Sequence, residues 1–473
     1  MPGLYHTLNI GAEALFTSRQ GVDTAGHNIA NAQTDGYSRQ RVNAEQRKPL
    51  EARGIVIGNG VFVKNITRAH DQFLEKQINK TNQDKGFSDS RQTELKALEG
   101  IYSPELNASI SDELSGFFNA VGELSNFPEE LTVRTHVREA AQNLVSAFRR
   151  IDSSLKVQQA NINQRIMGET DEVNILLNQI ADLNLQISAI ETTEAADAND
   201  LRDQQDRLLQ DLSTKMNVNY YQSDQGMLTI MGPNETLLVD KGYASQVGVA
   251  AKNGDSNLVD IVSIDAAGNT KVITNGIENG KIKGYLDVRD NVVESLLAKN
   301  NEMAFNLKDR VNEVHRQGFG LKDYGSSMGR DFFTGSDSVD NAAETIDLSG
   351  IISESTDAIS IAATPGAPGD NVIANNLMRL EHDKIMDNGK ASFKDFYANY
   401  VGSFGLDVVR SEHIDQANNI LMGDLKARRE AVSGVSMDEE AMNLLKWQAN
   451  FTASSRVITT VDEMLETVLA LKR

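Results

Sequence analysis

Seven histidines have the widest chemical range in this sequence, because imidazole can act as an acid, a base or a metal ligand near neutral pH. They are scattered without zinc-binding spacing, and no Gly-rich phosphate loop ending in Lys-Ser or Lys-Thr accompanies them. We therefore expect no catalytic, cofactor-binding or metal-binding residues, and no enzyme activity. The histidines are His6, His27, His70, His136, His315, His382 and His413.

Other polar or aromatic candidates also favour structural roles. Asp387–Lys390 is similar to part of a calcium loop but lacks the full ligand series and the bidentate Glu, so it predicts a turn. Glu129-Glu130 and Glu439-Glu440 lie near expected helix starts, where anions favour the helix dipole. We interpret His27 as a packing or hydrogen-bonding residue rather than a pH switch. Trp447, the only tryptophan, is interpreted as a packing anchor.

Composition limits the classes of protein to consider. The 473 residues suffice for two to four domains. The net charge of −21 argues against a general nucleic-acid or anionic-membrane partner, because no basic stripe offsets it. With no cysteine, disulfides and thiolate metal sites are excluded. The sequence shows neither a secretory h-region near its start nor an apolar run of membrane-spanning length, so composition alone would indicate a cytosolic protein.

Two stretches at the ends of the chain carry almost no charge. Asp23 is the only charged residue in 20–34 and Arg456 the only one in 447–461, although 24% of the chain is charged. Each stretch has the heptad spacing of a helix that packs against another helix. They could be two core helices of a globular domain, but the missing charge favours helices covered by neighbouring copies or partner proteins. The two seams are Leu8, Gly11, Leu15, Ser18, Val22, Ala25 and Ile29, and Leu444, Trp447, Phe451, Ser454, Ile458, Val461, Leu465 and Val468.

Glycines weaken the first of these helices. Gly11, Gly21 and Gly26 each cost about 1 kcal/mol of helix propensity relative to alanine. They also allow a neighbouring helix to approach closely. We therefore expect both ends to be poorly ordered in the monomer and to fold on packing. Limited proteolysis should then rapidly remove about 40 residues from each end and leave a resistant middle.

The periodicity between the ends changes several times. Residues 53–71 predict a short β-hairpin, and 72–216 predict long helices broken at Pro104, Pro128 and a loop at 195–200. Two apolar runs mark those helices. Residues 217–284 alternate with period two and predict a small β-rich insert. Helix is expected again at 281–315 and 391–431, and a mostly extended segment at 346–371. The two runs are Leu144, Phe148, Ile151, Leu155 and Ile162, and Val173, Leu176, Ile180, Leu183, Ile187 and Ile190.

These patterns predict a mainly α fold with a β insert, in the α+β class. A discontinuous coiled-coil domain of terminal helices would comprise 1–45 with 434–473. An elongated helical-bundle rod with a β-hairpin would comprise 46–216 with 285–433, and the small β-rich domain would be 217–284. Ser436 is expected to cap the last helix, with Glu439 at the capping-box position.

Two motifs carry a family resemblance. Asn28–Asn31, followed by Thr34-Asp35-Gly36-Tyr37-Ser38-Arg39-Gln40, resembles the N-terminal signature of bacterial flagellar rod, hook and hook-associated proteins, in which proline often replaces Asp35. Val311–His315, Gly318 and Arg330–Phe333 resemble the central signature of hook-associated proteins at the hook–filament junction. The last helix and its acidic pair are similar to the family's C-terminal block. Many relatives have far more sequence around 346–371, which puts an outer domain there in doubt.

The resemblance implies a structural role in a ring at the distal hook end, which connects the hook to the filament. It also implies an extracellular location reached by type III export without a cleaved signal. The implied partners are other copies of the chain, the hook protein, the second hook-associated junction protein and a cytoplasmic export chaperone near the C-terminus, with no nucleic acid or membrane. The expected assembly residues are Leu8, Leu15, Val22, Asn28, Ile29, Asn31, Gly36, Tyr37, Leu444, Trp447, Phe451, Ile458, Val461, Leu465 and Val468.

Two alternatives remain open. One is another axial protein such as a hook or rod component, which the central block disfavours. The other is a secreted enzyme or adhesin carried on the axial scaffold, for which 217–280 would have to form the site. That segment has no cluster of His, Asp or Glu, and is therefore poor material for an active site.

Overall fold

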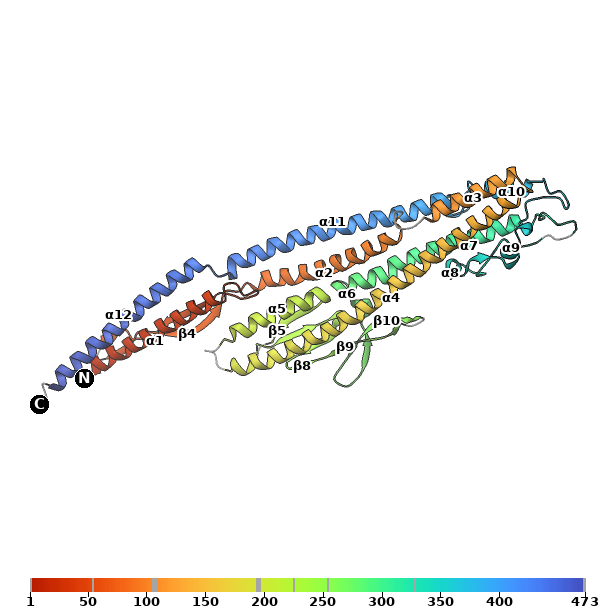
Figure 1. The fold of residues 1–473 in the computed structure, drawn as a ribbon. Helices are drawn as coiled ribbons and strands as arrows, with labels where there is room; N and C mark the ends of the chain where they lie inside the picture. Colours follow the sequence, from red (N-terminus) through yellow and green to blue (C-terminus); the bar gives the residue numbers. More distant parts are fainter. Residues whose placement is uncertain are drawn as a thin grey trace.

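The chain folds into a long helical rod from which the two ends project together as an arm (Figure 1). This computed structural model describes residues 2–52, 55–103, 109–192, 197–223, 226–252, 255–325 and 329–470. Its α-helices are α1 (Pro2–Ala30), α2 (Gln72–Ile101), α3 (Ile110–Asn126), α4 (Leu131–Ile190), α5 (Asn199–Lys215), α6 (Lys281–Asp287), α7 (Glu294–His315), α8 (Ala342–Thr345), α9 (Gly350–Glu354), α10 (Val372–Arg379), α11 (Phe393–Ser433) and α12 (Met437–Ala470).

The rod is a bundle of helices that run lengthwise beside one another. Helix α11 packs along α2, α3 and α5 pack on α4, and α6 and α7 extend the central layer (Figure 1). A π-helical turn, Val288–Val293, joins α6 to α7. The predicted break at Pro128 separates α3 from α4, whereas Pro104 and residues 195 and 196 of the expected loop lie outside the described residues.

Helix α4 shows why one helix can reach 60 residues. Its first predicted apolar run, from Leu144 to Ile162, is buried throughout, so tertiary packing supports a length that propensity alone would not. The second run is partly wrong. Leu177 is buried in place of Leu176, and Ile190 is 45% exposed. The helix also buries Asn184 completely, which breaks the simple apolar pattern.

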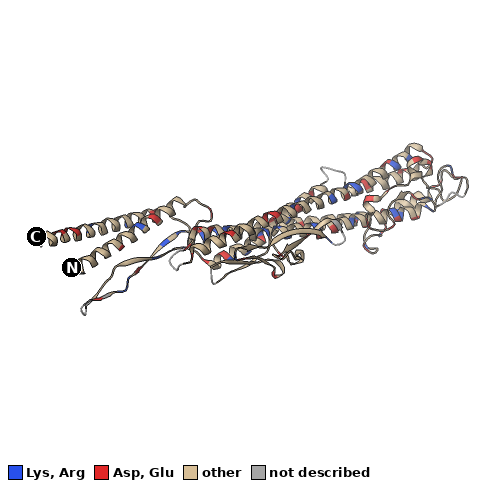
Figure 2. Cartoon of the chain, turned by 90° about the horizontal axis from the view of Figure 1, so that it is seen from below, with Lys and Arg blue, Asp and Glu red and all other residues tan. Residues whose placement is uncertain are grey.

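The β-hairpin differs from its prediction in both length and pairing. Strand β1 (Gln40–Gln46) pairs antiparallel with β4 (Val61–Arg68), and β2 (Leu50–Ala52) pairs with β3 (Ile55–Ile57). The predicted hairpin within 53–71 is therefore wrong in its pairing, because both of its strands pair with residues before 53. Alternation did not reveal β1 because most of its residues are exposed. Figure 2 shows the hairpin projecting beside the terminal helices.

The insert forms two small antiparallel sheets against α4. Strands β5 (Asn219–Gln222), β6 (Leu228–Met231), β7 (Leu237–Asp240) and β8 (Tyr243–Ala244) form one sheet in that order. Strands β9 (Gln246–Lys252), β10 (Asp255–Ile264) and β11 (Thr270–Val272) form the other, with β10 central. The strands within 217–284 confirm that this period-two segment is β-rich.

The segment after α7 is less extended than predicted. Phe332 and Phe333 of the central motif are buried, and β12 (Phe333–Thr334) pairs with β13 (Asp347–Leu348). The predicted extended segment 346–371 instead contains α9 and a 3-10 turn, because helices this short leave no periodic signal. The predicted turn at Asp387–Lys390 is confirmed, since Asp387, Asn388 and Gly389 all have positive φ.

The mainly α fold with small antiparallel sheets confirms the predicted fold class. Two long helices, α11 and α12, close the chain and return it to the end from which α1 started (Figure 1). Within the described ranges, no helix combines the length and the apolarity needed to cross a bilayer.

Candidate assembly interface

The arm is a pair of helices in which the two predicted seams face each other within one chain. Helices α1 and α12 lie side by side over much of their length (Figure 1). A Cβ at Gly11 would lie 3.0 Å from Ile458 Cγ1, and one at Gly21 would lie only 2.2 Å from the Trp447 ring. The glycines therefore permit close approach, and Trp447 is the packing anchor that the sequence predicted.

Burial follows the predicted spacing along both helices. Val461 is 1% exposed, and most other seam residues are partly buried, whereas Phe451 is 37% exposed. The seams thus have an intrachain partner, and their predicted contacts with other subunits stay a prediction. The partly buried predicted residues are Leu8, Leu15, Val22, Ile29, Leu444, Trp447, Ile458, Leu465 and Val468.

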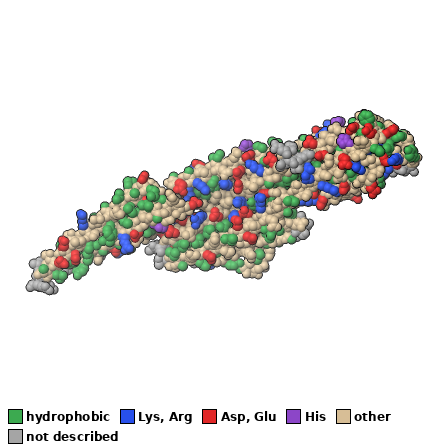
Figure 3. Space-filling view, in the orientation of Figure 1, with side chains coloured by type: hydrophobic (Ala, Val, Ile, Leu, Met, Phe, Trp, Pro, Cys, Tyr) green, Lys and Arg blue, Asp and Glu red, His purple; other side chains and the backbone are tan. Residues whose placement is uncertain are grey.

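Pairing of the seams leaves other apolar side chains of the arm exposed. They lie on α1 and, in larger number, on α12, beside the uncharged stretches noted in the sequence. Figure 3 shows hydrophobic side chains along one flank of the arm. A helix pair designed for water would carry charges at such positions. The residues are Tyr5, Phe16, Met442, Leu445, Phe451, Val457, Met464 and Leu469, which we call the outer face.

Asn28 is the centre of a polar joint at the base of the arm. Its side chain is buried, accepts from the Gln40 backbone N–H at 2.9 Å and donates to the Gln40 carbonyl at 2.9 Å. The Tyr37 hydroxyl donates to Asn28 Oδ1 at 2.7 Å, and Asn28 Nδ2 donates to Glu440 Oε2 at 3.1 Å. Asn28 therefore fixes the start of β1 and reaches α12.

Arg39 links the same joint to the first turn of α12. It forms ion pairs with Glu440 at 2.6 Å and with Glu439 at 2.7 Å, and its backbone N–H donates to the Ser433 carbonyl at 2.8 Å. Ser436 Oγ accepts from the Glu439 N–H at 3.4 Å, as the capping prediction required. The Glu439 carboxylate accepts from Arg39. The second bond of a capping box, from the Ser436 N–H to Glu439, is not found among the described residues.

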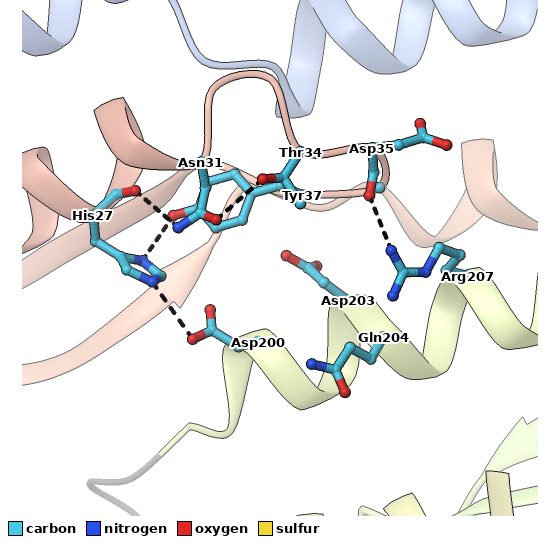
Figure 4. Close-up of a pocket in the computed structure, with 10 residues that line it drawn as sticks. His27, Asn31, Thr34, Asp35, Tyr37, Asp200, Asp203, Gln204 and Arg207 are labelled. Atoms are coloured by element: carbon cyan, nitrogen blue, oxygen red, sulfur yellow. Dashed lines mark hydrogen bonds and ion pairs between the residues drawn. The ribbon is translucent and has the colours of Figure 1, made fainter. Parts of the chain in front are cut away.

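Figure 4 shows the pocket between the motif and α5, with a volume of about 210 Å³. His27 Nδ1 lies 3.1 Å from the Tyr37 hydroxyl and Nε2 lies 3.6 Å from Asp200. Because the Tyr37 hydroxyl donates its own proton to Asn28, it acts as the acceptor toward His27, and Nδ1 is the donor in that bond. Burial, with the carboxylates of Asp200, Asp203 and Glu440, raises the pKa of Tyr37. The phenol therefore stays protonated and keeps donating.

Further bonds fasten the joint to the rod. The Ser38 N–H donates to Asp203 at 2.8 Å, and Arg68 pairs with Asp203 at 2.8 Å. Arg429 of α11 donates to the Gly36 carbonyl at 3.0 Å and pairs with Glu75 at 2.8 Å. These partners come from α2, α5, α11 and β4, so the joint holds the arm at one orientation relative to the bundle.

The structure separates the predicted residues into two groups. Asn28, Asn31, Gly36 and Tyr37 belong to the joint, where Gly36 has φ +80° in the turn after Asp35. The remaining residues belong to the arm's seam or outer face. Sequence reasoning placed Glu440 at the helix start and gave it no contact with the N-terminal motif, yet Glu440 is 2% exposed and bonds to two motif residues. The basic residue of the N-terminal motif, Arg39, was the one sequence signal that this acidic pair could have a partner there.

Two family models match parts of the chain. Residues 95–333 match the family model described as the flagellar hook-associated protein FlgK helical domain, and residues 430–471 match the flagellar basal body rod FlgEFG protein C-terminal model. The chain is 29% identical to "Flagellar hook-associated protein 1" of Bacillus subtilis (strain 168), over 99% of this chain and 98% of that protein. It is 24% identical to the protein of the same name from Salmonella typhimurium, over 98% of this chain and 99% of that protein.

A solved structure has a similar fold. The flagellar hook junction protein FlgK from Burkholderia pseudomallei superimposes with a TM-score of 0.66 at 15% sequence identity. The superposition covers 76% of this chain and all of that one. At this identity the match shows shared architecture only.

Proposed function

The chain belongs to the family of flagellar hook-associated proteins, and from that premise we propose that it forms a ring at the distal end of the hook. The protein is accordingly an extracellular structural component of the bacterial flagellum. In our proposal the ring joins the hook protein on one side to the second hook-associated junction protein, and through it to the filament. The role is passive and mechanical, without catalysis.

The arm carries the proposal. Its outer face exposes apolar side chains, Arg456 is the only charged residue in 447–461, and the polar joint holds the arm at one orientation. Burying such a face costs little desolvation, whereas covering charges would cost several kcal/mol for each unpaired ion. We therefore propose that the outer face, rather than the seam, makes most of the contacts with neighbouring copies. Asn28 acts within the chain and orients the arm.

We also propose the division into arm (1–45 with 434–473), rod (46–216 with 285–433) and insert (217–284). Pairing of α1 with α12 and packing of α11 on α2 support it. The boundaries at 45 and 284 fall inside β1 and α6, so neither is a flexible linker. An export chaperone that acts near the C-terminus would cover α12, whose apolar residues need protection before assembly.

Substitution of Phe451 by Asp tests the proposal. Phe451 is part of the outer face, so a carboxylate there should leave the rod folded and abolish filament attachment and motility. Phe451→Leu is the matched control, because it keeps an apolar side chain and should keep motility. Thermal unfolding of each purified variant checks that the rod is intact. Normal motility of cells carrying Phe451→Asp would contradict the proposal.

Ile458→Asp is expected to act differently. Ile458 faces Gly11 in the same chain, so a carboxylate there should open the pair of α1 and α12 as well as block attachment. Protease sensitivity of the arm distinguishes the two variants, because only Ile458→Asp should raise it in the monomer.

A further inference from the structure

Three asparagines of α4 face the β-rich insert. Asn163, Asn174 and Asn184 stand about three helical turns apart, and none is fully exposed. Asparagine is a poor residue for the middle of a long helix because its amide competes with the backbone. Each of these amides instead bonds to backbone groups of the insert, on a segment where the strand ladder is incomplete.

Asn174 covers the open edge of a sheet. Its Nδ2 donates to the Val247 carbonyl at 2.7 Å, and its Oδ1 accepts from the Val247 N–H at 2.8 Å. Val247 belongs to β9, the outer strand of its sheet. The amide thus replaces the neighbouring strand that an edge lacks, and it blocks that position against pairing with another chain.

Asn184 completes a broken pair between β6 and β7. These strands pair at Ile230 and Val239, and the same register would bring Leu228 opposite Lys241. Instead Asn184 bonds to both of these residues. It accepts from the Leu228 N–H at 2.8 Å and donates to the Leu228 carbonyl at 2.8 Å and the Lys241 carbonyl at 2.7 Å.

Asn163 satisfies an irregular segment of β10. The register of β10 against β9 shifts between Asp255 and Val259. Asn163 accepts from the Val259 N–H at 3.1 Å and donates to the Asn257 carbonyl at 3.2 Å. Arg289, buried in the π-helical turn, donates at 2.8 Å both to Asn163 Oδ1 and to the Val259 carbonyl.

We propose that these three asparagines are positioning residues that lock the insert in one register along α4, so that the insert braces the rod rather than hanging from it as an appendage. The lock spans residues 163–184, the part of α4 that extends beyond α3 and runs beside α5 and the sheets (Figure 1). This inference concerns the single chain and goes beyond the proposed junction role. It stands whether or not the ring is formed as proposed.

The amide is the side chain suited to this task, because it offers one acceptor and a donor at the spacing of a backbone peptide. Aspartate of the same shape keeps the acceptor but places a carboxylate oxygen against the Val247 carbonyl. When that carboxylate is protonated it regains a donor. Asn174→Asp therefore removes the lock at neutral pH and restores it in acid.

The experiment compares Asn174→Asp with Asn178→Asp in the full-length monomer. Asn178 is exposed on the same helix, and within the described residues its amide donates to the Asn174 backbone carbonyl and not to the insert. Asn178→Asp therefore adds the same charge one turn away. Amide hydrogen exchange should be about ten- to a hundredfold faster in β9 of Asn174→Asp at pH 7, with no such change in Asn178→Asp.

The pH dependence supplies the second readout. A carboxyl group that faces a carbonyl has its pKa raised in the folded state, so the lower melting temperature of Asn174→Asp should recover relative to Asn178→Asp as the pH falls toward 3.5. Equal exchange of β9 in the two variants would overturn the proposal. So would a melting deficit that does not change with pH, because it would reflect lost packing rather than a lost donor.

Discussion

Removal of the Glu440 carboxylate should release the first turn of α12 from the motif at the base of the arm. Glu440 is the acceptor for the Arg39 guanidinium at 2.6 Å and for the Asn28 amide at 3.1 Å. The side chains of Arg39 and Glu440 are only 12% and 3% exposed. Glu440→Ala would therefore remove one acceptor from a partly desolvated guanidinium and one from a buried amide.

The neighbouring carboxylate sets the scale of the effect. Removing one partner of a buried ion pair costs about 3–5 kcal/mol, whereas an exposed pair contributes about 0.2–1 kcal/mol. Glu439 binds the same guanidinium at 2.7 Å, but its side chain is 56% exposed. Glu440→Ala should thus destabilise docking of α12 on the motif by about 3–5 kcal/mol and Glu439→Ala by less than about 1 kcal/mol.

Amide hydrogen exchange of the monomer measures this difference. Since each 1.4 kcal/mol is a factor of ten, amides at the start of β1 and α12 should exchange about a hundred to a few thousand times faster in Glu440→Ala. Glu439→Ala should change them less than about tenfold. Amides in the centre of α4 serve as the internal reference. If the two alanine variants exchange alike, the joint does not depend on the buried carboxylate and our account of it is wrong.

Three further outcomes follow from the same contacts. Gly21→Ala should destabilise the arm by about 1–3 kcal/mol because its Cβ meets the Trp447 ring, whereas Gly26→Ala, with open space around its Cβ, should stabilise it by about 0.5–1 kcal/mol; thermal unfolding checks both. Burial lowers the pKa of His315 to about 4, so as the pH falls the unfolded chain binds a proton at this residue before the folded chain does. About 3 kcal/mol of folding stability should therefore disappear between pH 6.5 and 4. Denaturant titrations should show this loss in the unmodified protein and not in His315→Gln. Limited proteolysis should cut the monomer first at the two ends and leave the rod, and resistance of both terminal helices would contradict an arm held mainly by its joint.

Heptad spacing predicted the arm because it is a local property of the sequence. Of the positions from Leu444 to Val468 that were expected to face a helix, all except Phe451 are at least partly buried, and Gly21 lies under Trp447. Spacing does not reveal which helix is the partner. The predicted contacts with neighbouring copies therefore became, in the single chain, contacts between its own two ends.

The joint and the asparagine lock could not be predicted in the same way. Each depends on partners far apart in the sequence, such as Asn28 with Glu440, and on backbone groups whose identity the side chains do not record. Asn174 and Asn184 look like weak points in a helix until the strands they serve are in place. Strand β1 was missed for a related reason, because an exposed strand carries no alternation.

The distribution of charge ties these features to assembly. At the joint the chain places ion pairs that are mostly buried, such as Arg39 with Glu440 and Arg68 with Asp203, and such pairs fix orientation more than they add stability. In residues 447–461 of the arm Arg456 is the only charge, so a neighbouring copy could cover that stretch with little desolvation of ions. Orientation is thus set by bonds within one chain before any neighbour arrives. A subunit whose arm is already oriented would lose less conformational entropy on joining the ring that we propose, and apolar contacts could then hold it there.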